Sequence, residues 1–228
     1  MKKIDVVFPT ANKADNKTIF IVGKTGTGKT TLYANFLASR NRFVAYDSQC
    51  ELENWQDAVT VTTVDNLVSA LENGWEKIVY QPEKQDDSDS LELVIATVKE
   101  FQLLNPQLGE VTFGLDELSA FVEPSYCPPA LKDLVQRGRR AHIEKIFCTQ
   151  FFSRVPAFVR DSAKHIYAFC QTDKVALQKL SEYGFDPETL FNLPDMHGIH
   201  YDLKTFENFQ LVPTTNNQQK HPERMFRV

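Results

Sequence analysis

The chain has 228 residues and a mass of 26.1 kDa, enough for one α/β domain with a full hydrophobic core. Apolar residues make up 42% of it and charged residues 24%, proportions that are ordinary for a water-soluble globular protein. No apolar run approaches the roughly 20 residues of a membrane span, and no apolar segment follows the basic N-terminus as in a signal peptide. We therefore expect a cytoplasmic protein with no integral membrane segment.

The formal net charge of −5 hides an uneven distribution along the chain. Residues 50–123 hold 16 acidic and 3 basic side chains, whereas residues 131–165 hold 8 basic and 3 acidic ones. The overall balance argues against indiscriminate binding of nucleic acid. The basic segment fits two interpretations: a local nucleic-acid surface, or side chains that face acidic neighbours or ATP. Its basic residues are Lys132, Arg137, Arg139, Arg140, Lys145, Arg154, Arg160 and Lys164.

A polar arm, residues 1–17, precedes a β-prone run at 18–22 that leads into a phosphate-binding pattern. The pattern GxxxxGK[ST] is matched at Gly23, Gly28, Lys29 and Thr30. A helical segment, 30–39, follows it, so strand, glycine-rich loop and helix stand in the order that the motif requires. The predicted nucleotide-binding residues are Gly23, Lys24, Thr25, Gly26, Thr27, Gly28, Lys29, Thr30 and Thr31.

The chemistry of this loop indicates ATP and Mg²⁺ as cofactors. Glycines let the backbone curl so that several N–H groups point at an anion, and the helix that follows adds the positive end of its dipole. We expect Lys29 to reach the β- and γ-phosphates and the Thr30 hydroxyl to bind Mg²⁺. Thr31 is placed for the α-phosphate.

Strand-like and helix-like segments then alternate along the chain. The β-prone runs are residues 42–47, 59–64, 77–80, 111–115, 146–149 and 165–169. Helical patterns fall at residues 65–73, 91–101, 131–141, 174–183 and 187–192. A hairpin at 199–203 and 206–212 ends the predicted ATPase domain, residues 18–212, and a polar tail, 213–228, follows. Such alternation predicts a mostly parallel central sheet flanked by helices, with ligands at the carboxyl ends of the strands.

Two strand ends carry the second half of the predicted site. Asp116 and Glu117 follow an apolar strand, where Asp116 can hold Mg²⁺ and Glu117 can polarise the attacking water. Gln150 ends the next strand and can sense the γ-phosphate or orient water. Each of these residues also fits an ordinary turn at the end of a strand, so the functional interpretation depends on the P-loop upstream.

Charge that develops on the γ-phosphate needs a cation, which an arginine from the same or a neighbouring subunit can supply. Arg137, Arg139 and Arg140 cluster before the strand that ends at Gln150, and Arg160 lies after it. One of these four is expected to act in this way. Each also fits a solvated basic face or a DNA contact.

Taken in order, these motifs resemble the FtsK/HerA branch of RecA-like (ASCE) P-loop ATPases over roughly residues 18–170. Thr149 and Gln150, with Arg139 and Arg140 upstream, narrow the resemblance within the superfamily. The compact size is most similar to genome-packaging ATPases of membrane-containing icosahedral viruses and phages. The acidic overall balance departs from what a DNA pump leads one to expect, although a ring needs positive charge only along its pore.

The resemblance implies a homo-oligomeric ring, expected to be a hexamer, that moves double-stranded DNA through its centre and binds ATP between subunits. By position, Lys29, Glu117, Gln150 and Arg139 or Arg140 take the catalytic roles, and Thr30 and Asp116 the metal roles. Capsid vertex or portal proteins are implied as partners, in the host cytoplasm or on the virion. The segment 119–129, which contains Tyr126, is either the pore loop or a plain surface loop.

Three other functions fit the same motifs. The first is a P-loop nucleotide or small-molecule kinase, which the adjacent Asp116 and Glu117 and the strand-end Gln150 disfavour. The second is an assembly protein that uses ATP only as a switch or structural ligand. The third is a phage export ATPase, a relative expected to carry a membrane span.

Overall fold

The structure is a computed structural model that describes residues 18–52, 55, 57–85, 87–205, 207–213 and 226–227. The predicted N-terminal arm and most of the predicted tail lie outside these residues. The described strands form one sheet in the order β10-β9-β8-β7-β1-β6-β5-β2-β4-β3. β1 to β7 run parallel, and β8, β9 and β10 are added antiparallel at one end. The parallel sheet and the C-terminal hairpin predicted from the sequence are confirmed.

The strands are short and mostly buried. Their bounds are β1 Thr18–Val22, β2 Phe43–Tyr46, β3 Val59–Val61, β4 Lys77–Tyr80, β5 Val111–Leu115, β6 Ile143–Thr149, β7 His165–Phe169, β8 Gly198–Asp202, β9 Glu207–Pro213 and β10 Phe226–Arg227. The α-helices are α1 Lys29–Ala38, α2 Val64–Glu72, α3 Ser88–Leu104, α4 Pro129–Arg137, α5 Ala157–Arg160, α6 Lys174–Ser181 and α7 Pro187–Phe191. Short 3-10 turns are η1 Pro106–Leu108, η2 Leu118–Ala120, η3 Gly138–Ala141 and η4 Phe152–Arg154.

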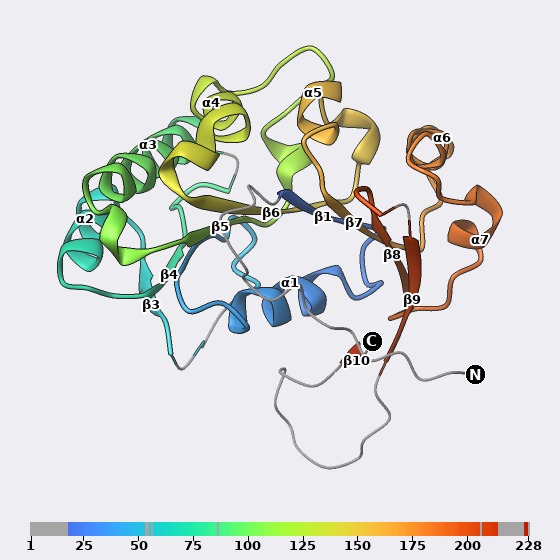
Figure 1. Ribbon diagram of the computed structural model, residues 1–228, viewed down its shortest axis with the longest axis horizontal. Helices are drawn as coiled ribbons and strands as arrows, with labels where there is room; N and C mark the ends of the chain where they lie inside the picture. Colours follow the sequence, from blue (N-terminus) through green and yellow to red (C-terminus); the bar gives the residue numbers. More distant parts are fainter. Residues whose placement is uncertain are drawn as a thin grey trace.

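Helices cover both faces of the sheet, as Figure 1 shows. α1 lies on one face, α2 to α5 lie on the other, and α6 and α7 stand beside the hairpin strands β8 and β9. Because side chains alternate along a strand, β1 serves both cores: Phe20 and Val22 belong to the cluster under α2 to α5, and Ile19 and Ile21 to the cluster over α1. The central strand is therefore buried on both faces and is held rigidly in place.

Two charged residues at the start of β6 explain why the sequence predicted that strand too short. The strand begins at Ile143 rather than 146, with Glu144 2% exposed and Lys145 fully buried. The Glu144 carboxylate accepts Arg40 Nε at 2.6 Å and the Thr112 hydroxyl at 2.8 Å, which compensates for its loss of hydration. Burial lowers the pKa of Lys145 to about 8. Long-range pairing of this kind leaves no local pattern in the sequence.

Two other expectations differ from the structure at element ends. The basic helix expected over 131–141 is α-helical from Pro129 only to Arg137, and Gly138–Ala141 form the 3-10 turn η3. The turn closes at His142, whose φ of 52° lies in the left-handed region and directs the chain into β6. Within the segment expected to be a tail, Phe226 and Arg227 pair with Val212 and Pro213 of β9.

Buried aromatic contacts at the sheet end involve a histidine that is neutral in the fold. The His200 ring stacks on Tyr167 with centroids 4.2 Å apart, and its Nε2 lies 3.2 Å from Nδ1 of His165. Burial, reinforced by His165 and opposed by Asp202, lowers the pKa of His200 from 6.5 to about 4.

Acid should therefore destabilise the fold through His200. Below the ordinary pKa of histidine, His200 binds a proton in the unfolded chain but stays neutral in the folded chain. The folding stability that is present near neutral pH is therefore lost as the pH falls. We expect a loss of about 2 kcal/mol from this group between about pH 7.5 and about pH 5. Urea unfolding of His200→Phe should show a smaller pH dependence than the wild type. An unchanged pH dependence in His200→Phe would contradict the assignment.

Candidate active site

The P-loop leaves β1 at the carboxyl edge of the sheet, and its glycines are required by its shape. Gly26 and Gly28 have φ values of +80° and +105°, which side chains rarely allow. A Cβ on Gly23 would lie 2.7 Å from the Cβ of Phe169 on β7. Backbone N–H groups of Gly23 and Lys24 donate to the carbonyls of Thr149 at 3.3 Å and of Cys170 at 3.0 Å. The loop is thus hydrogen-bonded to β6 and to the residue after β7.

The side chains of Lys29 and Thr27 both donate hydrogen bonds to the backbone of the P-loop. Lys29 Nζ donates to the carbonyl of Lys24 at 3.0 Å, and the Thr27 hydroxyl donates to the same oxygen at 2.7 Å. Lys29 is only 8% exposed. A buried ammonium with one neutral acceptor attracts an anion strongly, which fits the phosphate-binding role predicted from the sequence.

Asp116 emerges from β5 into a strongly acidic environment. Its carboxylate is 6% exposed. Burial first, then the negative charges of Glu51, Asp47 and Glu117, raise its pKa to about 7, while Lys29 lowers it. Three other carboxylates and one ammonium therefore influence Asp116 at the end of the sheet.

Glu117 and Gln150, predicted from separate strand ends, are brought together. The backbone N–H of Gln150 lies 3.2 Å from each carboxylate oxygen of Glu117, and the Thr149 hydroxyl donates to Glu117 at 3.4 Å. The Ser119 hydroxyl also donates to it. The Thr25 hydroxyl of the P-loop donates to Gln150 Oε1 at 2.9 Å. A hydrogen-bonded chain thus runs from the P-loop through Gln150 to Glu117.

Sequence reasoning missed Glu51 and assigned no chemistry to Asp47. The Thr30 hydroxyl donates to Glu51 Oε2. Asp47 is fully buried after β2, and its carboxylate accepts the backbone N–H groups of Glu51 and Leu52, both at 3.0 Å. The spacing of these two acids after a buried strand was the available signal, but only the pairing of β2 with β5 places them beside Asp116.

The oxygen donors at this edge suit Mg²⁺, which prefers hydroxyl, carboxylate and phosphate oxygens. Thr30 and Asp116 are the residues that would hold it. Burial first and neighbouring negative charge second raise the pKa of Asp116, and a divalent cation would offset the part due to charge. Within the described part of the chain, no three His, Cys, Asp or Glu side chains are grouped so that they could hold a metal by themselves.

The predicted arginines lie elsewhere. Arg139 and Arg140 are exposed in η3, at the amino end of β6, whereas Gln150 follows its carboxyl end. Seven residues of strand, about 20 Å, separate the two ends. Arg160 is 7% exposed and Lys145 is fully buried, so both are removed from the accessible basic surface. Arg137 donates to Asp133 at 3.2 Å.

The candidate pore loop, residues 119–129, begins within η2 and follows the carboxyl end of β5. Glu123 and Tyr126 exchange two backbone hydrogen bonds of 2.9 Å, which close a tight turn. The Tyr126 side chain is 50% exposed at this turn. An ordered turn with an exposed aromatic ring fits both interpretations given to segment 119–129.

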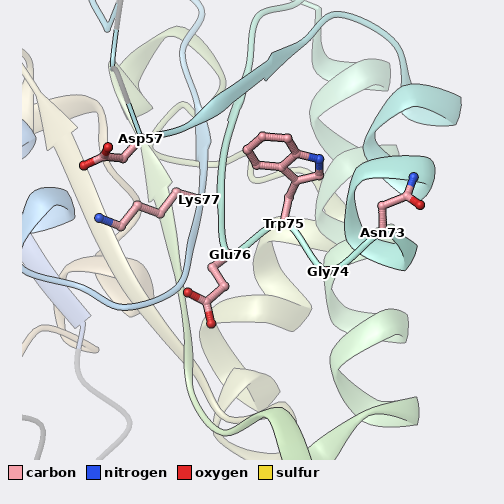
Figure 2. Close-up of a pocket in the computed structure, with 6 residues that line it drawn as sticks. All are labelled: Asp57, Asn73, Gly74, Trp75, Glu76 and Lys77. Atoms are coloured by element: carbon pink, nitrogen blue, oxygen red, sulfur yellow. The ribbon is translucent and has the colours of Figure 1, made fainter.

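An open surface pocket lies away from this chemistry. Its volume is about 430 Å³, and Figure 2 shows the Trp75 ring and the Asp57 and Lys77 side chains around it. Lys77 begins β4, so the cavity opens at the amino edge of the sheet, opposite the P-loop. It is not the nucleotide site.

Solved structures share this fold at low sequence identity. The genome packaging NTPase B204 of Sulfolobus turreted icosahedral virus 2, solved with AMPPCP, has a TM-score of 0.73 and 18% identity over 90% of this chain and 100% of that chain. The bacterial conjugative coupling protein TrwB has a TM-score of 0.61 and 11% identity, covering 92% of this chain and 87% of its own. VirB4 of Thermoanaerobacter pseudethanolicus has a TM-score of 0.60 and 12% identity, covering 87% and 90%.

No model of a known protein family matches the sequence, and no curated protein matches it. At such identities the likeness establishes the fold alone, a RecA-like arrangement of a mostly parallel sheet flanked by helices. None of the described helices combines the length and apolarity needed to cross a membrane.

Gly114 lies on β5, two residues before Asp116, and packs tightly against Tyr33. We therefore expect a larger side chain at position 114 to destabilise the fold. A Cβ on Gly114 would lie 2.3 Å from the hydroxyl oxygen of Tyr33, which is buried with no hydrogen-bond partner among the described residues. We expect Gly114→Ala to destabilise the fold by about 2 kcal/mol. Tyr33→Phe alone should be neutral or stabilising because it removes a buried, unsatisfied hydroxyl.

The double variant should recover part of the loss, because the shortest clash is with the hydroxyl itself. Thermal or urea unfolding of the four proteins measures the coupling. Strict additivity would show that Tyr33 does not oppose the added methyl group.

Proposed function

We propose that this protein is a Mg²⁺-dependent ATPase that translocates double-stranded DNA, and that its task is to package a viral genome into a preformed capsid. The observation that carries the proposal is the hydrogen-bonded chain Thr25–Gln150–Glu117 at the P-loop, beside Asp116. The shared fold with the packaging NTPase B204 and with TrwB supports the choice of a motor over other ATPases.

Each site residue has a role that its contacts support. Lys29 binds the β- and γ-phosphates, for which it gives up its bond to the Lys24 carbonyl. Thr30 and Asp116 hold Mg²⁺, which when bound neutralises charge on the phosphates. Glu117 accepts a proton from the attacking water. Gln150 couples the two halves because its side chain contacts the P-loop while its backbone contacts Glu117.

A ring of identical subunits would supply the arginine that the site of a single subunit lacks. Arg139 and Arg140 lie at the opposite edge of the sheet from their own P-loop, so they can stabilise the transferring phosphate only across an interface between copies. A homo-oligomeric ring, taken as a hexamer, is therefore part of the proposal. The turn at Tyr126 and the exposed basic residues are proposed to contact the DNA backbone, and a capsid vertex or portal protein to hold the ring.

ATP turnover measured with and without linear double-stranded DNA at low salt tests the motor. We expect DNA to stimulate release of free phosphate, and Lys29→Ala and Glu117→Gln each to lower turnover by about 100-fold or more. Glu117→Gln should still bind ATP, because it retains the shape of the site. Glu72→Gln, at an exposed glutamate in the last turn of α2, is the control and should behave as wild type.

Turnover without DNA stimulation would contradict the translocation part of the proposal. Transfer of phosphate to an acceptor in place of water would identify a kinase. Full function of Glu117→Gln would identify an assembly protein that uses ATP only as a ligand.

A mixing experiment tests the arginines. Lys29→Ala inactivates the P-loop side of an interface, and the double variant Arg139→Ala/Arg140→Ala inactivates the arginine side. If the arginines act across the interface, an equal mixture of the two inactive proteins should regain activity, because about a quarter of the interfaces in random rings pair two intact sides. Arg137→Ala, an exposed arginine already paired with Asp133, is the control. No recovery, despite mixed rings, would exclude action in trans.

A further inference from the structure

The turn after β2 presents a carboxylate to the P-loop threonine. Asp47 fixes this turn from inside: it accepts two backbone N–H groups of the turn at 3.0 Å and Nε2 of Gln81 at 3.1 Å. Within the turn, Cys50 has a φ of 54°, a conformation unusual for a side-chain-bearing residue. Four features of local structure thus agree in directing Glu51 toward α1.

The Thr30 hydroxyl has one proton and two acceptor lone pairs. Its proton is donated to Glu51 Oε2 on the β2 turn, which leaves the lone pairs available. A hydroxyl that binds a cation through oxygen must still give its proton to an acceptor. Second-shell acceptors of this kind orient metal ligands and tune their affinity.

We propose, on the basis of the function above, that Glu51 is a positioning residue for the active-site Mg²⁺: it takes the Thr30 proton, aims the hydroxyl oxygen at the cation, and adds a second carboxylate charge beside Asp116. Asp47 supports Glu51 indirectly, because its carboxylate accepts backbone N–H groups of the turn that carries Glu51.

The test is direct binding of Mn²⁺, as a spectroscopic substitute for Mg²⁺, to the protein saturated with ATPγS, followed by electron paramagnetic resonance. Glu51→Ala should weaken Mn²⁺ binding about 10-fold or more. Glu51→Gln retains an acceptor oxygen but not the charge, so its Mn²⁺ affinity should fall between those of wild type and Glu51→Ala. The matched control is Glu83→Ala, an exposed glutamate on the loop after β4 at the same edge of the sheet.

Binding of ATPγS in excess EDTA distinguishes a loss of metal positioning from general damage to the nucleotide site. We expect Glu51→Ala to bind metal-free nucleotide as well as wild type, because Glu51 contacts the threonine and repels phosphate charge. Asp47→Asn should weaken Mn²⁺ binding in the same direction, because it loosens the turn. Equal Mn²⁺ affinity in wild type and Glu51→Ala would overturn the inference, as would an equal loss of metal-free nucleotide binding. Failure of the wild type itself to bind Mn²⁺ with ATPγS would instead overturn the proposed ATPase function.

Discussion

The parallel register of β1 with its two neighbours is the constraint on which the site depends. Val22 lies opposite Thr149 of β6 and Ala168 of β7, so β1 and β6 end at one level and β7 ends one residue further on. Gly23 and Lys24 then donate their N–H groups to the carbonyls of Thr149 and Cys170, and the glycine loop starts from a fixed point. A shift of one residue in this register would turn Phe20 and Val22 to the opposite core and separate the P-loop from Gln150.

This geometry concentrates negative charge where the fold least tolerates it. Asp47 is fully buried and Asp116 nearly so, and the mutual repulsion of the carboxylates adds to the loss of hydration. Asp47 is compensated by three hydrogen bonds, but Asp116 gains only partial relief from Lys29. A fold that retains an uncompensated buried carboxylate is expected to recover that free energy when a cation binds, and this couples stability to ligand.

How far the sequence predicts this site depends on how local each signal is. The P-loop, Asp116, Glu117 and Gln150 each stand at the end of an apolar run, so a linear pattern reveals them, and the fold brings them to one edge as expected. Glu51 gives no such signal, because its importance arises from the pairing of β2 with β5 and from a turn organised by Asp47. The first residues of β6 were missed for a similar reason: Glu144 reads as polar surface until Arg40, more than 100 residues away, is seen to pair with it.

The difference between position in the sequence and position in the fold also matters for the basic residues, which the proposed function needs in an otherwise acidic chain. Of the basic residues that the sequence grouped in 131–165, Lys145 and Arg160 are buried and Arg137 is paired with Asp133, so they do not form one continuous basic face. Arg139 and Arg140 remain exposed at the amino edge, remote from the chemistry of their own subunit. Under the proposed function, these two arginines would gain a partner when a second copy presents its P-loop edge. On that proposal, the position of Arg139 and Arg140 is therefore better explained by contacts between copies than by DNA binding on one subunit, and such contacts would make assembly a precondition of catalysis.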